Sequence, residues 1–270
     1  MREAVIVIPA RYASTRYPAK PLATLRGAKG TPRTLLERSV IAARRAAEVT
    51  PGVTGIFVAT DDERIAAEAA RIGADIILTD PECPNGTARV AQAVQRATLA
   101  QPIIVNLQGD APLTPPHFVT ALIAAMRDDP ARQVATPVLR CDREALDNFL
   151  NDRKAGRVGA TTVVRDALGN AIYFSKEVIP FTGSLKRHDP IPVFHHVGLY
   201  AYTPQALRLY ASLPTGQLEL IEGLEQLRFL EHGHRIAAVE VSAPGAAFWE
   251  LNNPSDVPLI EGYLKRMGID

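Results

Sequence analysis

The residues with the clearest chemical potential lie in a basic loop that follows a short apolar segment near the N-terminus. Positions 9–22 read PARYASTRYPAKPL, in which Arg11, Arg16 and Lys20 alternate with hydroxyl side chains and prolines. Arginine offers forked donors and lysine a point charge, so the loop suits the binding of a triphosphate. The spacing matches neither GxGxxG nor GxxxxGK[ST], so neither of those nucleotide-binding motifs is indicated. A solvated basic loop of no special function has the same composition and is the alternative.

A carboxylate follows another apolar segment. Asp110 belongs to the run Gln108-Gly-Asp-Ala-Pro, which comes directly after the mainly apolar segment 103–107. A carboxylate at the end of a buried strand is costly unless it is paired or bound to a metal. Magnesium takes one or two carboxylates and completes its shell with phosphates and water. Considered together with the basic loop, Asp110 is expected to bind Mg²⁺.

Short polar side chains open a predicted helix in the run Asn85-Gly86-Thr87-Ala88-Arg89. Backbone N–H groups at such a position can hold an anion, and the side chains can read the edge of a base. An ordinary N-cap formed by Asn85 explains the same run.

Two segments of the second half carry polar side chains at regular spacing. In a predicted strand at 196–202, alternation places His196 and Tyr200 on one face. The segment 218–232 has apolar residues at every third position and is predicted to be one helix. Its charged residues, Arg228 among them, are expected to face solvent.

The hydrophobic pattern predicts the elements that position these residues. Strands are predicted at 4–8, 55–60, 75–79 and 103–107, and helices at 35–49, 61–72, 87–100 and 115–127. Four strand–helix units in succession indicate a mostly parallel sheet with right-handed crossovers. Ligands bind beyond the carboxyl ends of such strands, which is where the basic loop, Asn85 and Asp110 fall.

The second half differs from the first. The sequence predicts a hairpin over 161–174, strands at 196–202 and 235–241, helices at 218–232 and 254–267, and a loop at 180–193. These elements would add mixed strands to the parallel sheet, together with a small C-terminal lobe. We expect a single domain over residues 1–270.

Length and charge restrict the class of protein. The chain has 270 residues, with 30 Lys and Arg against 29 Asp and Glu, for a net charge of +1. This balance argues against binding to nucleic acid or to an anionic membrane surface. No apolar stretch approaches the ~20 residues that a membrane span needs. Cys83 and Cys141 form no disulfide or metal pattern, and they fit a reducing cytoplasm.

Six segments carry a more specific signature. They are IPARYASTRYPAKPL at 8–22, VATDDERI at 58–65, VNLQGDAP at 105–112, AIYFSK at 171–176, HHVGLYAY at 195–202 and LELIEGLEQLR at 218–228. In this order they resemble the 3-deoxy-manno-octulosonate (Kdo) cytidylyltransferases, also called CMP-Kdo synthetases. The resemblance implies an α/β, three-layer nucleotidyltransferase fold (nucleotide-diphospho-sugar transferase-like) and a homodimer. It also implies transfer of CMP from CTP to the anomeric hydroxyl of Kdo or a related 3-deoxy-2-ulosonic acid, with release of pyrophosphate, for lipopolysaccharide or capsule synthesis.

The resemblance also assigns roles to residues. It implies that CTP is bound by Ala10, Arg11, Ser14, Lys20, Asn85, Gly86, Thr87, Arg89 and Gln108. The sugar acid would meet Gln108, His196, Tyr200, Glu225 and Gln226. Magnesium would be held by Asp110 and Asn252, and catalysis would rest on Arg11, Lys20 and Asp110. Residues 1–140 would form the nucleotide-binding half, and residues 141–270 the half for sugar-acid binding and dimerisation. An acidic group near Asp110, or a metal-bound alkoxide, would accept the proton of the attacking hydroxyl.

Departures from the family pattern gather around the same site. Ala88 and Ala111 stand where the family usually has glutamate, Thr162 stands where a lysine is expected, and Asn252 replaces the expected metal-binding aspartate. An amide oxygen can bind a metal but brings no charge, so Mg²⁺ binding should weaken. Two alternatives therefore stay open. One is a degenerate relative that binds nucleotide or sugar acid without turnover, and the other is CMP activation of a different acid, such as 8-amino-Kdo or a nonulosonic acid.

Overall fold

A computed structural model describes residues 1–13, 17–157, 160–183, 185–186, 189–243 and 250–270. The strands are β1 (Ala4–Pro9), β2 (Thr24–Arg26), β3 (Pro32–Thr34), β4 (Val53–Thr60), β5 (Asp75–Leu78), β6 (Ile103–Leu107), β7 (Val134–Arg140), β8 (Thr162–Arg165), β9 (Ala171–Ser175), β10 (Phe194–His196), β11 (Leu199–Tyr202) and β12 (Ala237–Val241). The helices are α1 (Leu35–Val49), α2 (Glu63–Arg71), α3 (Gly86–Arg96), α4 (Pro116–Asp128), α5 (Arg143–Lys154), α6 (Pro204–Ser212), α7 (Gln217–Glu222), α8 (Leu227–Glu231) and α9 (Val257–Arg266). Two short 3-10 turns, η1 (Lys20–Leu22) and η2 (Pro254–Asp256), complete the described elements.

One large sheet takes strands from both halves of the chain. Its order is β5-β4-β1-β6-β11-β7-β10-β8-β9, and β12 lies beside β7. Strands β5, β4, β1 and β6 are mutually parallel, which confirms the prediction for the first half. Strand β11 enters antiparallel between β6 and β7. The second half therefore completes the sheet of the first.

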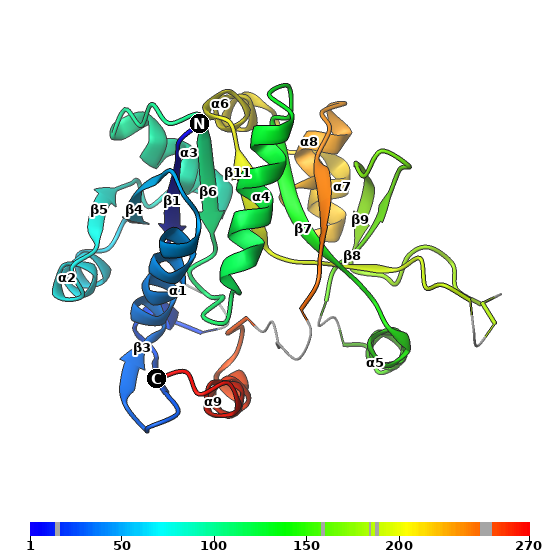
Figure 1. Cartoon of the computed structure of the whole chain (residues 1–270), viewed down its shortest axis with the longest axis horizontal. Coiled ribbons are helices and arrows are strands. Elements are labelled where there is room, and N and C mark those ends of the chain that lie inside the picture. Colours follow the sequence, from blue (N-terminus) through cyan, green and yellow to red (C-terminus); the bar gives the residue numbers. More distant parts are fainter. Residues whose placement is uncertain (14–16, 158–159, 184, 187–188, 244–249) are drawn as a thin grey trace.

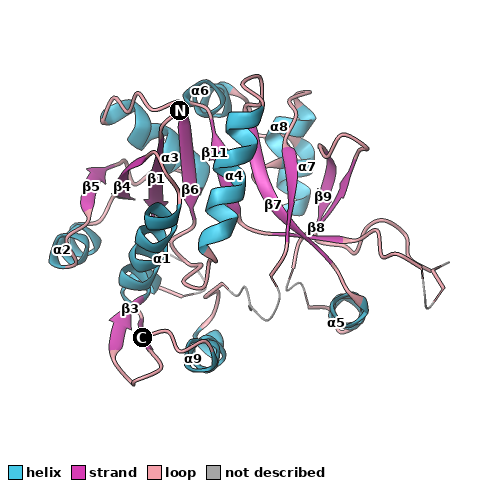
Figure 2. Ribbon diagram, in the orientation of Figure 1, coloured by secondary structure: helices cyan, strands magenta, loops and turns pink. Residues whose placement is uncertain are grey.

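Helices cover both faces of the sheet, as Figures 1 and 2 show. Helices α1, α2 and α4 pack on one face with the apolar side chains of β1 and β6 that point that way. Helices α3, α6 and α8 contribute to the core on the opposite face. The predicted α/β three-layer architecture is thus confirmed. The C-terminal helix α9 packs against the β2–β3 hairpin and against Leu113, close to Asp110.

Two elements that were predicted to be continuous are each interrupted in the structure. The predicted helix 218–232 is two short helices, because Gly223 adopts a left-handed conformation (φ 61°) that ends α7. Its every-third apolar pattern does not mark a buried stripe, since Leu218 and Ile221 of that pattern are 38% and 72% exposed. The predicted strand 196–202 is broken after His196, where the chain leaves β8 and turns toward β6. His196 and Tyr200 nonetheless lie on the same side of the sheet, as predicted, with their ring centres 5.5 Å apart.

Five of the described strands and helices were not predicted: β2 and β3, which form a hairpin, strand β7, and helices α5 and α6. Helix α5 is poor in apolar residues and buries only Leu146, so it carries little helical periodicity. Strand β7 contains Pro137 and ends in a charged residue, which obscures its apolar run. Within the described ranges, no helix is both long enough and apolar enough to cross a lipid bilayer.

Candidate active site

The basic loop and the metal-candidate carboxylate meet at the carboxyl ends of β1 and β6. The Lys20 Nζ lies 2.7 Å from Asp110 Oδ2, and the two side chains are 14% and 25% exposed. Gly109 lets the Asp110 loop approach this closely, because a Cβ at that position would lie 2.7 Å from the Pro9 carbonyl oxygen. Arg11, at the start of the same basic loop, is exposed. Ala10 is buried, and its N–H donates to the Ala59 carbonyl at 2.9 Å. Ser14 lies outside the described residues.

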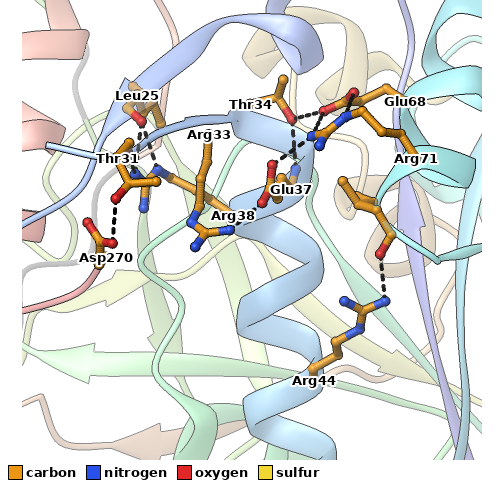
Figure 3. A network of polar contacts seen from close by, with 11 residues as sticks. Leu25, Thr31, Arg33, Thr34, Glu37, Arg38, Arg44, Glu68, Arg71 and Asp270 are labelled. Carbon is orange, nitrogen blue, oxygen red and sulfur yellow. Dashed lines mark hydrogen bonds and ion pairs between the residues drawn. The ribbon is translucent and has the colours of Figure 1, made fainter. Parts of the chain in front are cut away.

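A buried cation holds the β2–β3 hairpin that comes shortly after Lys20. Arg38, on α1, donates from Nη2 to the Leu25 carbonyl (2.8 Å) and to the Thr31 carbonyl (3.4 Å). Asp270 accepts from the Thr31 hydroxyl at 2.6 Å, which ties the last residue of the sequence to the same hairpin. Burial lowers the pKa of the Arg38 guanidinium from its usual value. Figure 3 shows this cluster, which fixes the hairpin that directly follows Lys20.

A second set of contacts joins the start of α1 to α2. The Thr34 hydroxyl accepts from the Glu37 N–H (3.0 Å) and donates to Glu68 (2.6 Å). Arg71 bridges Glu37 (2.8 Å) and Glu68 (2.7 Å), and these contacts lower the pKa of Glu68. Figure 3 shows these contacts beside the first cluster. Because the pairs with Arg71 are partly exposed, we expect them to orient the helices more than to stabilise the protein.

The N-terminus of α3 lies against the second half of the chain. Asn85 caps the helix by accepting from the Ala88 N–H (2.9 Å), and its Nδ2 donates to the Tyr210 hydroxyl (2.7 Å). The N-cap interpretation of Asn85 is therefore confirmed. The Thr87 hydroxyl donates to Glu225 Oε1 at 3.0 Å. A Cβ on Gly86 would lie 3.1 Å from the Gln108 side chain, so Gln108 lies directly beside this helix end.

Arg89 has a different setting from the other residues of this run. Its guanidinium is 3% exposed and forms an ion pair with Asp61 at 2.8 Å, after β4. It also donates to the Thr79 hydroxyl, after β5. These contacts tie the ends of two neighbouring strands to α3 and leave the guanidinium little access to a ligand in this state of the protein.

The predicted sugar-acid residues gather on the α3 side of the sheet. The rings of His196 and Tyr200 are 5.5 Å apart, and His196 Nε2 lies 3.0 Å from the Thr136 hydroxyl. Burial lowers the pKa of His196 to about 3, so its ring is neutral at physiological pH and suits hydrogen bonding. Burial raises the pKa of Glu225, while the hydrogen bonds from Thr87 oppose that change.

The two predicted metal-binding residues lie on adjacent segments. The Leu251 N–H donates to the Asp110 carbonyl at 2.9 Å, which places Asn252 on the segment beside the Asp110 loop. The Asn252 N–H itself donates to Asp256 at 2.8 Å. In the part of the chain that the structure describes, no three His, Cys, Asp or Glu side chains converge on a common point.

Two residues of this site were not singled out from the sequence. Asn106 is fully buried on β6 opposite Tyr200 of β11. Its sequence signal is an amide within an otherwise apolar strand. Glu250 packs against Gly198, where an added Cβ would lie 2.8 Å from Glu250 Oε1 and 3.9 Å from Gln108 Cγ. A side chain at position 198 would therefore displace that carboxylate, and no pattern in the sequence connects these two positions.

The model of a protein family described as Cytidylyltransferase matches residues 5–236. The chain belongs to this family. A 3-deoxy-manno-octulosonate cytidylyltransferase of Maricaulis maris (strain MCS10) is 40% identical over 262 residues, covering 97% of each chain. An 8-amino-3,8-dideoxy-manno-octulosonate cytidylyltransferase of Shewanella piezotolerans is 38% identical over 261 residues, covering 96% of this chain and 97% of that protein.

Solved structures give the same assignment to the cytidylyltransferases. A CMP:2-keto-3-deoxy-manno-octonic acid synthetase complexed with CTP superposes with a TM-score of 0.81 at 31% identity, covering 98% of this chain and 99% of that one. The family resemblance of the six sequence segments is therefore confirmed, and so is the nucleotidyltransferase fold that it implied.

Proposed function

We propose that this cytidylyltransferase transfers CMP from CTP to the anomeric hydroxyl of Kdo or a closely related 3-deoxy-2-ulosonic acid and releases pyrophosphate. The observation that carries the proposal is the Lys20–Asp110 pair at 2.7 Å, next to the opening of α3, in a chain with relatives of that named activity. The product would serve lipopolysaccharide or capsule synthesis in the cytoplasm. Residues 1–140 would supply the nucleotide side of one catalytic unit, and residues 141–270 the sugar-acid side.

The charges of the site suit this reaction. The sugar hydroxyl would attack the α-phosphorus in line while the bond to pyrophosphate breaks. Such a transfer needs little covalent help from a protein and depends on positioning and on neutralised phosphate charge. Arg11 and Lys20 would supply cationic donors, and the Gly86 N–H at the start of α3 would add a backbone donor beside Gln108. Ser14 is proposed to assist them.

The residues near Asp110 fit Mg²⁺. The Asp110 carboxylate is partly accessible, and Asn252 lies on the segment bonded to its loop. One carboxylate and one amide oxygen form a donor set that magnesium would complete with phosphate oxygens and water. When bound, the ion would neutralise phosphate charge.

Restoring a carboxylate at position 252 tests this assignment. We expect Asn252→Asp to lower the Mg²⁺ concentration for half-maximal rate roughly tenfold, because a charged ligand replaces a neutral one. Mn²⁺ binding to the CTP complex, followed by electron paramagnetic resonance, should tighten in parallel. Asn253→Asp makes the same charge change at an exposed neighbour and serves as control. Equal metal dependence in Asn252→Asp and the wild type would place residue 252 outside the metal site.

A pyrophosphate-release assay tests the proposed activity. The assay would use CTP, Mg²⁺ or Mn²⁺, and a panel of Kdo, 8-amino-Kdo and a nonulosonic acid. We expect release with at least one 3-deoxy-octulosonic acid. The competing function is a non-catalytic binder of nucleotide or sugar acid, which the neutral Asn252 favours. CTP binding without release of pyrophosphate for any acid would establish that alternative.

We infer that the enzyme is a homodimer through the face formed by α7 and the edge strand β9. Leu220 and Ile221 of α7 and Ile172 of β9 are exposed apolar side chains. Glu222 joins these elements, since it accepts from the Ser175 hydroxyl at 2.6 Å. A second copy presenting the same face would bury these groups at a two-fold axis. Sedimentation velocity of wild type and Ile221→Lys tests the inference, because the variant should sediment as a monomer.

A further inference from the structure

Asn106 is a buried amide whose hydrogen-bonding capacity is unused. The side chain is fully enclosed on β6, and neither its Oδ1 nor its Nδ2 has a partner among the described residues. Burying an amide without a hydrogen-bond partner destabilises a folded protein. Folded proteins seldom leave both atoms of one amide in this condition. An amide kept at such a position therefore points to a role outside the folding of the free protein.

The location of Asn106 indicates what that role is. It lies between Val7 of β1 and Tyr200 of β11 in the sheet register. By strand alternation its side chain faces the same side as Tyr200, toward α3. Gln108 follows on the same face of the chain, and a Cβ on Gly198 would contact its Cγ at 3.9 Å. Asn106 thus lies beneath the surface that carries the sugar-acid residues.

A second unused amide borders the same region. Gln226 is 4% exposed, and its Nε2 has no partner in the described part of the chain. Its neighbour Glu225 accepts a hydrogen bond from the Thr87 hydroxyl. The pKa of Tyr200 is raised mainly by burial and then by Tyr202, and the Glu225 carboxylate adds to the rise. Two incomplete amides from distant parts of the sequence therefore lie in this region: Asn106 is opposite Tyr200 in the sheet, and Gln226 adjoins Glu225. The described residues therefore leave buried hydrogen-bonding groups of this region without partners.

We propose that Asn106 is a positioning residue for the sugar acid, whose amide completes its hydrogen bonds only when the acid is bound above it at Tyr200. In the free enzyme the amide is a cost to stability, and in the complex it fixes the floor of the pocket. The inference deepens the proposed function and rests on it. On this proposal, a residue that is fully buried in the free protein contributes to the recognition of polar groups of the sugar acid.

Asn106→Leu separates the two states, because leucine has a similar branched shape and no polar atoms. Without ligand, we expect the melting temperature to rise by about 2–4 °C, since a buried unpaired amide is removed. The KM for the sugar acid should rise about tenfold, and the KM for CTP should stay unchanged. The thermal shift produced by sugar acid in the presence of CTP should shrink accordingly. Asn106→Thr, which keeps a hydroxyl in a smaller volume, should recover part of the sugar-acid affinity.

Thr50→Val is the matched control. Thr50 is also a buried polar residue, but it follows α1 and its hydroxyl is 2.7 Å from the Thr120 hydroxyl of α4, on the face of the sheet opposite α3. This variant should lose stability and keep both KM values. A lower melting temperature for Asn106→Leu, or an unchanged KM for the sugar acid, would overturn the inference. If the wild type itself turns over no acid, the proposed function fails, whereas a wild-type-like Asn106→Leu in an active enzyme refutes only the role of Asn106.

Discussion

Replacing Asp110 by alanine should abolish measurable turnover while leaving the fold intact. The carboxylate lies at the end of buried strand β6 and is 2.7 Å from Lys20 Nζ. Its removal would leave that ammonium without its counter-charge and would take away the one charged ligand of the proposed magnesium site. Loss of a single electrostatic contributor in an active site costs roughly 10²–10³ in rate. We expect a loss of at least this size in pyrophosphate release.

The controls for Asp110→Ala separate chemistry from folding. Asp147, exposed on α5, provides a matched aspartate-to-alanine change remote from the Lys20–Asp110 pair, and this variant should keep wild-type activity. Circular dichroism and the melting temperature should show both variants folded. Lys20→Met should also lose activity, but by weakening CTP binding, which calorimetry can detect directly. Turnover retained in Asp110→Ala would remove this residue from both catalysis and metal binding.

Replacing Arg228 by methionine should cost about 3–5 kcal/mol in the free energy of unfolding, because it leaves a buried carboxylate without its counter-charge. Arg228 donates to both oxygens of Glu219 at 2.7 Å, and the two side chains are 8% and 9% exposed. The hydrogen bond to Glu219 raises the pKa of Arg228, so the guanidinium stays charged. The guanidinium also lies 4.2 Å from the ring centre of Tyr210, whose hydroxyl holds Asn85.

Chemical denaturation measures this loss, with Arg208→Met on the exposed face of α6 as control. The double variant Arg228→Met, Glu219→Leu should recover most of the stability, because no buried charge then remains unpaired. Arg228→Met should also raise the KM for CTP, since Tyr210 and Asn85 lose their support. An effect below about 1 kcal/mol would mean that water reaches Glu219 and compensates for the missing partner.

The parts of the fold that were predicted correctly are those in which local pattern and final burial agree. The apolar runs at β1 and β6 are enclosed on both faces, so an uninterrupted run was enough to predict them. Arg228 was wrongly expected on a solvated face, because its burial depends on Glu219 and Tyr210, which only tertiary packing brings together. The break at Gly223 likewise depends on how α7 docks near Lys176, not on the spacing of apolar residues.

The residues of the candidate site were likewise predictable only in part. The meeting of Lys20 with Asp110 was predictable, because parallel strands deliver their carboxyl ends to one edge of the sheet. The contact of Thr87 with Glu225 joins the two halves of the chain and required the resemblance to a family before either residue could be assigned a place in the site. Asn106 was not predicted as a site residue, because what marks it is the lack of hydrogen-bond partners among the described residues, and this depends on the folded structure.

The position of β11 between β6 and β7 has a consequence for the order of folding. Leu107 and Leu199, which pair across this junction, are separated by some 90 residues of chain. Closing a loop of that length costs on the order of 4 kcal/mol in chain entropy before the contacts of the strand repay it. Contacts so remote in sequence slow the folding of a domain. We therefore expect the β1–β4–β5 part of the sheet to form early, and the region around Tyr200 to be among the last to become protected from solvent exchange.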